Sequence, residues 1–154
     1  MFTKKLAGIC AVAFMMLSLS AVQANQWNKK TVLNFDQPVQ VPGALLAPGT
    51  YVFKLADTLA SRDVVQIFNK NQTKLVMTII AIPDRRLETD DKTVLEFWET
   101  PQGNPVALRS WFYPGDNRGF EFPYPKNQAR LISKRVHKEV PVLERAEADL
   151  KDIR

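Results

Sequence analysis

The residues best suited to acid–base chemistry are carboxylates in the second half of the chain. Glu96, Glu99 and Glu121 lie in or beside segments whose polarity alternates from one residue to the next. A glycosidase commonly needs two carboxylates about 5 to 10 Å apart across its substrate, and nothing in the sequence brings Glu96 near Glu121. The chain also has no phosphate-binding loop, nucleophile elbow or zinc motif. We therefore assign no catalytic residue, and an enzyme is the less favoured class.

Side chains for a metal centre are equally scarce. His137 is the only histidine, and its close neighbours are mostly cationic, whereas a zinc site needs several ligands together. The segment 84–92 carries acidic side chains, but it contains no glycine and interleaves arginine and lysine, unlike a calcium loop. We expect His137 to be solvated at a helix end, the segment to be a charged loop, and the protein to hold no metal or other cofactor.

Aromatic residues are the most informative feature, because many of them gather between residues 97 and 124. The cluster consists of Phe97, Trp98, Trp111, Phe112, Tyr113, Phe120, Phe122 and Tyr124. Successive side chains of a strand point to opposite faces of its sheet. Trp111 and Phe112 therefore cannot both enter one core, and one of them must lie on the other face.

Strand alternation predicts a second, aromatic face opposite the core. If Phe112 points inward, then Trp98, Arg109 and Trp111 share the opposite face, with Tyr113 beside it. Exposed aromatic rings next to a charged group are suited to stacking on a sugar or to anchoring a protein partner. We therefore predict a ligand-binding face there, for a cell-envelope glycan or another envelope protein. The competing interpretation is that a C-terminal helix covers Trp98 and Trp111.

The elements that must position these residues are short strands separated by proline, glycine, asparagine and aspartate. The expected strands are 31–35, 38–43, 51–55, 63–68, 74–82, 93–99, 106–113 and 119–122. Their number and spacing predict an antiparallel β-sandwich or small barrel of about seven or eight strands. The nearly continuous apolar run 75–82 predicts a central strand covered on both faces. The prolines of 38–43 predict an edge strand.

The C-terminal part, 126–154, changes to helical spacing, with apolar residues three and four positions apart on either side of Pro141. One or two helices are expected there. This tail has 8 basic and 5 acidic side chains, whereas 25–125 has 11 of each. A uniformly basic surface for nucleic acid is therefore not expected on the body of the protein.

The first 24 residues have the three-part pattern of a cleavable signal peptide. A cationic start precedes an uncharged apolar run, which ends in small residues before Ala24. A membrane anchor is the alternative, but Ser18, Ser20 and Gln23 interrupt the end of that run. Cys10, the only cysteine, lies in this segment. We therefore expect a periplasmic or secreted mature protein without thiols and without a transmembrane segment.

Several short phrases of the chain form a recognisable set. They are Trp27 to Val32, Val41-Pro42-Gly43, Leu46 to Tyr51, Val65 to Asn69, Ala81-Ile82-Pro83, Trp111 to Gly115 and Gly119 to Pro125. Together they resemble a family of small exported proteins of soil bacteria that has no assigned activity. The resemblance covers about 27–131 and implies an exported β protein with no catalytic residues to transfer.

These observations predict three parts: a signal peptide at 1–24, a β domain at 25–125 and a helical tail at 126–154. The predicted function is a non-enzymatic binding or structural module of the cell envelope. The alternative is an envelope hydrolase that acts on a glycan through acidic residues.

Overall fold

The computed structural model describes residues 29–56 and 63–143. The predicted signal peptide, including Cys10, lies outside the described residues, and so does most of the second predicted tail helix. None of the helices in the described ranges is long and apolar enough to cross a membrane.

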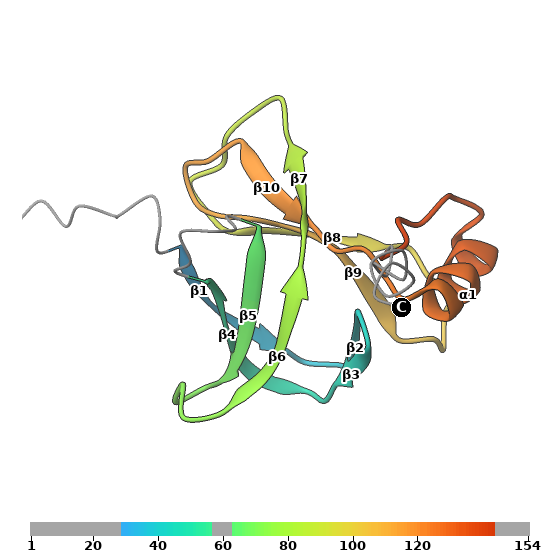
Figure 1. Cartoon of the computed structure of the whole chain (residues 1–154), viewed down its shortest axis with the longest axis horizontal. Helices are drawn as coiled ribbons and strands as arrows, with labels where there is room; N and C mark the ends of the chain where they lie inside the picture. Colours follow the sequence, from blue (N-terminus) through green and yellow to red (C-terminus); the bar gives the residue numbers. More distant parts are fainter. Residues whose placement is uncertain (1–28, 57–62, 144–154) are drawn as a thin grey trace, which may run out of the picture.

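The described part of the chain forms ten strands and one helix (Figure 1). They are β1 (Lys30–Phe35), β2 (Val39–Val41), β3 (Ala44–Leu46), β4 (Gly49–Leu55), β5 (Val64–Asn69), β6 (Leu75–Ile80), β7 (Ile82–Arg85), β8 (Val94–Trp98), β9 (Val106–Phe112), β10 (Arg118–Glu121) and α1 (Lys126–Val136). The fold is mainly β, as predicted, because the alternating segments between turn residues all become strands.

The strands form two sheets, which we call sheet A and sheet B. Sheet A has the order β1-β4-β5-β6, and sheet B has the order β3-β2-β9-β10-β7, with β8 also paired to β9. All pairs are antiparallel except β2 with β9. The inner faces of the two sheets meet in one apolar core. Of the two predicted arrangements, the sandwich is therefore the one observed.

Aromatic side chains from both sheets build the centre of this core. The centre of the Phe53 ring, in β4, lies 6.0 Å from the centre of the Trp111 ring, in β9, and 6.5 Å from the centre of the Phe122 ring. Both are edge-to-face contacts. Leu33 and Phe35 of β1 are both buried, as the alternation of that strand predicts. Edge-to-face rings add to the free energy gained by burying apolar surface.

The predicted central strand is an edge strand, so that prediction is wrong. The backbone N–H of Ala81 donates to Asp63 at 2.7 Å, and directly after it the chain leaves sheet A and continues into sheet B as β7 (Figure 1). The apolar run 75–82 is thus divided between the free edges of two sheets. Ile79 is buried, but Ile80 is 62% exposed.

The segment 38–43 was predicted as an edge strand, and this is also wrong. Its strand, β2, lies between β3 and β9. Pro38 and Pro42 flank the three residues of β2 and stand outside its pairing. They therefore remove no hydrogen bond from the ladder, although proline cannot donate one.

Helix α1 begins after Pro125 and ends at His137, which has the left-handed conformation of a C-terminal cap and is exposed. This agrees with the predicted helix start and the predicted place of His137. Ala129 and Ile132 are buried against Trp98 and form a second, smaller apolar cluster. The helix therefore covers the outer face of sheet B, by which we mean the face turned away from sheet A.

Candidate functional site

The predicted aromatic ligand face is not formed, because the two tryptophans lie on opposite faces of sheet B. Trp111 is 0% exposed and packs between the sheets, with Phe120 at 5.6 Å. Trp98 is 5% exposed and lies under α1. The competing interpretation, a helix that covers both rings, is right for Trp98 and wrong for Trp111.

A bulge in β9 explains why strand alternation failed. Glu96 of β8 pairs with Ser110, but the next residue, Phe97, pairs with Leu108. Arg109 is therefore an extra residue with no partner in β8, although on the other side its carbonyl accepts a hydrogen bond from the backbone N–H of Phe122 at 2.8 Å. An extra residue shifts the alternation of all residues that follow it. Leu108 and Trp111 consequently both enter the core between the sheets.

Arg109 is the predicted site residue that does reach an accessible position. Its guanidinium carbon lies 4.8 Å from the centre of the Trp98 ring, and its Nε lies 3.3 Å from Oε1 of Glu121. The side chain of Arg109 is 41% exposed. Tyr113 is half-buried and packs against the core between the sheets, so it does not belong to the same surface.

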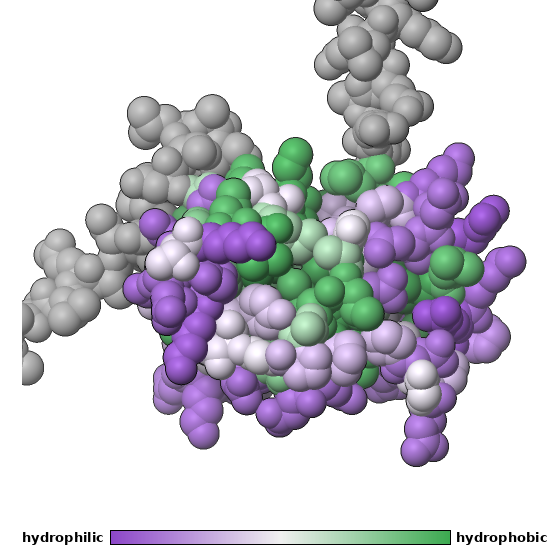
Figure 2. Space-filling view, turned by 90° about the horizontal axis from the view of Figure 1, so that it is seen from below, coloured by the Kyte–Doolittle hydropathy of each residue, from purple (hydrophilic) through white to green (hydrophobic). Residues whose placement is uncertain are grey.

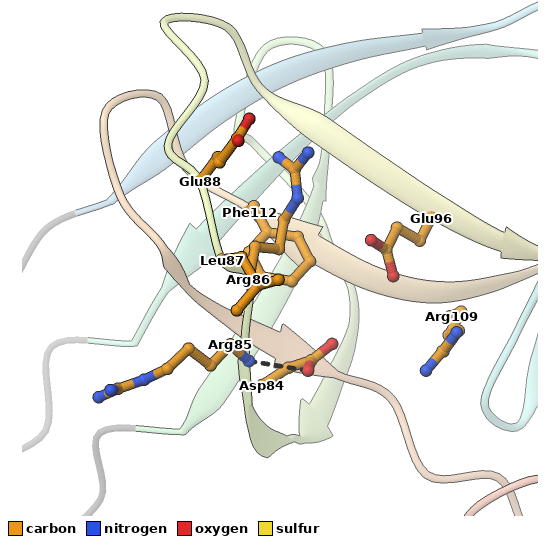
Figure 3. Close-up of a pocket in the computed structure, with 8 residues that line it drawn as sticks. All are labelled: Asp84, Arg85, Arg86, Leu87, Glu88, Glu96, Arg109 and Phe112. Atoms are coloured by element: carbon orange, nitrogen blue, oxygen red, sulfur yellow. Dashed lines mark hydrogen bonds between the residues drawn. The ribbon is translucent and has the colours of Figure 1, made fainter.

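Two hollows adjoin Arg109 on the outer face of sheet B. The first, of about 470 Å³, is lined by Asp84, Arg85, Arg86, Leu87, Glu88, Glu96, Arg109 and Phe112 (Figure 3). The second, of about 420 Å³, is lined by Glu96, Phe97, Trp98, Glu99, Arg109, Arg135, Val136 and Lys138. Because Glu96 and Arg109 border both hollows, we treat them as one surface and call it the sheet B groove. It runs from the β7–β8 connection to the end of α1.

At the first hollow, the ring of Phe112 packs against the backbone of Gly119. Gly119 of β10 is directly opposite Phe112 in the ladder. A Cβ atom at Gly119 would lie only 2.4 Å from two atoms of the Phe112 ring. The guanidinium carbon of Arg86 lies 5.3 Å from the ring centre. The Phe112 ring is thus packed between the backbone of Gly119 and the guanidinium group of Arg86. It is the apolar base of a hollow whose other lining residues are mostly charged.

Asp84 is oriented by two hydrogen bonds. Ser110 donates its hydroxyl proton to Oδ2 of Asp84 at 2.7 Å, and the backbone N–H of Arg85 donates to Oδ1 at 2.8 Å. Figure 3 shows the second of these bonds, with the Arg85 side chain extending away from the hollow. Ser110 is fully buried. Its hydroxyl has a carboxylate partner but no histidine, since His137 caps α1.

The register of the strands places two of the candidate acidic residues, Glu96 and Glu121, on one surface. The sequence alone could not predict that they lie close together. Glu96 of β8 and Glu121 of β10 both pair with Ser110, from opposite sides of β9. With strands about 4.8 Å apart, their Cα atoms are about 10 Å apart. Arg109 forms an ion pair with Glu121. Among the described residues, no three histidine, cysteine or acidic side chains are grouped as metal ligands.

No family model, curated protein or solved structure matches this chain. The resemblance to an exported bacterial family therefore stays a prediction.

Proposed function

We propose that this protein is an exported, non-enzymatic binding module of the cell envelope whose ligand lies along the sheet B groove. The observation that supports this most is the fixed position of Arg109 between the Trp98 ring and Glu121 at the meeting point of two hollows. A side chain held in one orientation loses little conformational entropy when it binds a ligand. Arg109 is therefore oriented to donate hydrogen bonds to a ligand that lies in the groove.

The charges of the groove favour a polar ligand that carries both donors and acceptors. Both hollows contain acidic and basic side chains, and Glu96 and Arg109 stand where the hollows meet. Carboxylates accept hydrogen bonds from hydroxyl and amide groups, and guanidinium groups donate to carbonyl and carboxylate oxygens. A cell-envelope glycan that carries amide and carboxylate substituents offers this combination, so we propose it as the ligand class.

A binding role fits the groove better than catalysis does. Ser110 is buried, and its hydroxyl donates to Asp84 rather than to a base. The carboxyl group of Glu121 is engaged by Arg109 at 3.3 Å, so it is already used within the protein and is not free to act on a bound glycan.

The test is a calorimetric titration of the protein with soluble peptidoglycan fragments, with a neutral glucan as the comparison ligand. Glu96→Gln removes one charge where the two hollows meet and keeps the shape of the side chain. We expect this variant to bind at least tenfold more weakly. Lys70→Ala is the control, because Lys70 is an exposed residue of the β5–β6 turn in sheet A. Equal affinities for the two variants would contradict the proposed site.

A hydrolase is the second candidate, and one observation favours it. Glu96 and Glu121 flank Ser110 on one surface at about 10 Å between Cα atoms, and inverting glycosidases place their carboxyl groups about 6.5 to 9.5 Å apart. Release of reducing ends from the same peptidoglycan fragments, abolished by Glu96→Gln, would establish this function instead. Binding without release of reducing ends supports the binding module.

A further inference from the structure

Sheet A has an edge, independent of the sheet B groove, that no strand of residues 29–56 and 63–143 covers. Its last strand is β6, which contains neither a charged residue nor a proline. Leu75, Val76 and Ile80 are exposed by 46%, 39% and 62%. Figure 2 shows the molecule from below, where apolar side chains gather in the middle of the face and charged ones surround them. Natural edge strands are usually protected by charges or prolines.

Backbone geometry shows which groups of β6 are free to pair. The N–H of Ala81 donates to the carbonyl of Asp63, the residue before β5, and the carbonyl of Val64 points in the opposite direction and accepts from the N–H of Ala56. Because hydrogen-bonding direction alternates along an antiparallel strand, Met77 and Ile79 bond to β5. Thr78 and Ile80 therefore point their N–H and C=O groups toward the open edge.

The regular part of this edge is short and symmetric about one residue. The register between β5 and β6 is irregular at Ile67 and Phe68, and beyond that point it is continuous from Met77 to Ile80. With Ala81, whose N–H continues this pattern by donating to Asp63 directly before β5, the regular stretch is 77–81. Its centre is Ile79.

We propose that β6 pairs antiparallel with β6 of a second copy of this chain, about a twofold axis at Ile79. In this register Thr78 of each copy opposes Ile80 of the other, so the four residues with free backbone groups form two hydrogen-bonded pairs. The axis is perpendicular to the sheet, and the two four-stranded sheets become one continuous sheet. An interface of this kind is the same patch on both copies, as a twofold dimer requires.

Side chains and charges are compatible with this pairing. No charge lies between Leu75 and Ile82, so no like charges oppose each other across the axis. The first charged residues beyond this stretch are Lys74 at one end and Asp84 at the other. Asp84 belongs to β7 of sheet B, so Lys74 is the charged residue at the end of the proposed interface. A parallel pairing in register would bring Lys74 of one copy next to Lys74 of the other, and the repulsion of these like charges favours the antiparallel orientation.

Two matched substitutions test the proposal. Ile80→Lys puts a charge on the proposed interface, and Val32→Lys puts one on β1, the other edge strand of sheet A. The two replaced side chains are exposed by 62% and 63%, so neither change disturbs the core of one copy. In sedimentation experiments over a range of concentrations, we expect dimers for the unchanged full chain and for Val32→Lys. Dimers of Ile80→Lys should dissociate at least tenfold more readily.

Hydrogen exchange tests the same edge in the unchanged protein. In the dimer the amides of Thr78 and Ile80 donate to the second copy, so they should exchange slowly at high concentration and rapidly on dilution. A chain that is monomeric at every concentration would overturn the proposal. So would equal dissociation of the two lysine variants, which would place a dimer contact elsewhere, or protection of Thr78 and Ile80 that appears only when another protein is added.

Discussion

Gly119 is the position at which a single methyl group should disturb the sheet B groove most. Gly119→Ala would place a Cβ atom 2.4 Å from Cδ1 and Cε1 of Phe112 and 2.9 Å from its Cγ. Carbon atoms in good contact are about 3.5 to 4.0 Å apart, so the ring must move by about 1 Å. Phe112 is only 1% exposed, and Arg86 lies over it. The ring can therefore move only toward the hollow, where it must displace the guanidinium group of Arg86.

The expected loss of stability is the difference between two effects. Overpacking a filled site costs about 1–3 kcal/mol. Replacing a glycine inside a strand by alanine gains about 0.5–1 kcal/mol, because the unfolded chain has less conformational freedom to lose. An approach of 2.4 Å to two ring atoms is a severe clash, so the overpacking cost should lie in the upper part of its range, at about 2–3 kcal/mol. We therefore expect Gly119→Ala to lower the free energy of unfolding by about 1–2.5 kcal/mol. Urea denaturation at pH 7 measures this, since a shift of the midpoint at constant slope reports stability alone.

Phe112→Leu supplies the control for this prediction. Without the ring, the added methyl group has room, so Gly119→Ala should be neutral or stabilising in the Phe112→Leu background. The double-mutant cycle then gives a coupling energy of at least about 1 kcal/mol between the two positions. The reasoning is refuted if the loss is below about 0.5 kcal/mol, which is typical of a surface site, or is equal in both backgrounds.

Two further predictions concern side-chain hydrogen bonds between residues that are far apart in the sequence. Burial works to raise the pKa of Asp116, but the hydrogen bonds from Lys29 and from the backbone of Arg118, together with the charges of these two residues, outweigh it and hold the pKa below the usual 3.8. A carboxylate with a lowered pKa stabilises the fold above its unfolded pKa, and this stability is lost as the pH falls through the folded value. Asp116→Asn should therefore cost about 1–2 kcal/mol at pH 7 and progressively less in urea denaturation as the pH falls below 3.8; a cost that does not change with pH would contradict the ion pair. Burial also raises the pKa of Tyr124, whose hydroxyl shares its one proton between the carbonyl oxygens of Leu108, at 2.7 Å, and Gln40, at 3.0 Å. Tyr124→Phe should cost about 1–3 kcal/mol, and in an alkaline absorbance titration one tyrosine of the unchanged protein should ionise only on unfolding; ionisation of all tyrosines in the folded protein would refute this.

Strand positions could be predicted from the sequence because the signals for them are local. The hairpin of β5 and β6 is an example: the Asn69 side chain accepts backbone hydrogen bonds from Thr73 at 2.9 Å and Lys74 at 3.0 Å, and asparagine favours such turns wherever it occurs. The start of α1 after Pro125 is also local, since proline is accepted where a helix begins.

The place of each strand in its sheet could not be predicted, because it depends on residues far away in the chain. The run 75–82 has the composition of a central strand, but its division between two sheets at Ala81 is decided by the pairing of β7 with β10. The groove residues Asp84 and Arg86, and the buried Ser110 that hydrogen-bonds to Asp84, were missed for the same reason. They come from β7, the segment after it and β9, and only the register places them together. The closest sequence signal is Gly119, whose missing side chain leaves room for Phe112.

The bulge at Arg109 determines both the core and the groove. It lets Leu108 and Trp111 face inward, and between them two consecutive polar side chains reach carboxylates, Arg109 to Glu121 and Ser110 to Asp84. In a regular strand these neighbours would point to opposite faces. Bulges are common where a strand must redirect a side chain next to a functional site.

Because Arg109 is the extra residue of the bulge, we expect that it can be deleted without loss of the fold. Deletion removes the extra residue, so the ladder becomes regular and Leu108, Ser110 and Trp111 keep the faces they have now. We expect the deletion variant to unfold cooperatively, with a stability close to that of Arg109→Ala, because both changes leave Glu121 without its cation. Both variants should also lose binding of peptidoglycan fragments. Deletion of Leu108 is the control. It shortens the strand equally but puts the charged side chain of Arg109 at the buried position that Leu108 occupies, so it should abolish folding. If deletion of Arg109 unfolds the protein as deletion of Leu108 does, residue 109 is an integral part of the strand and the explanation of the groove by a bulge is wrong.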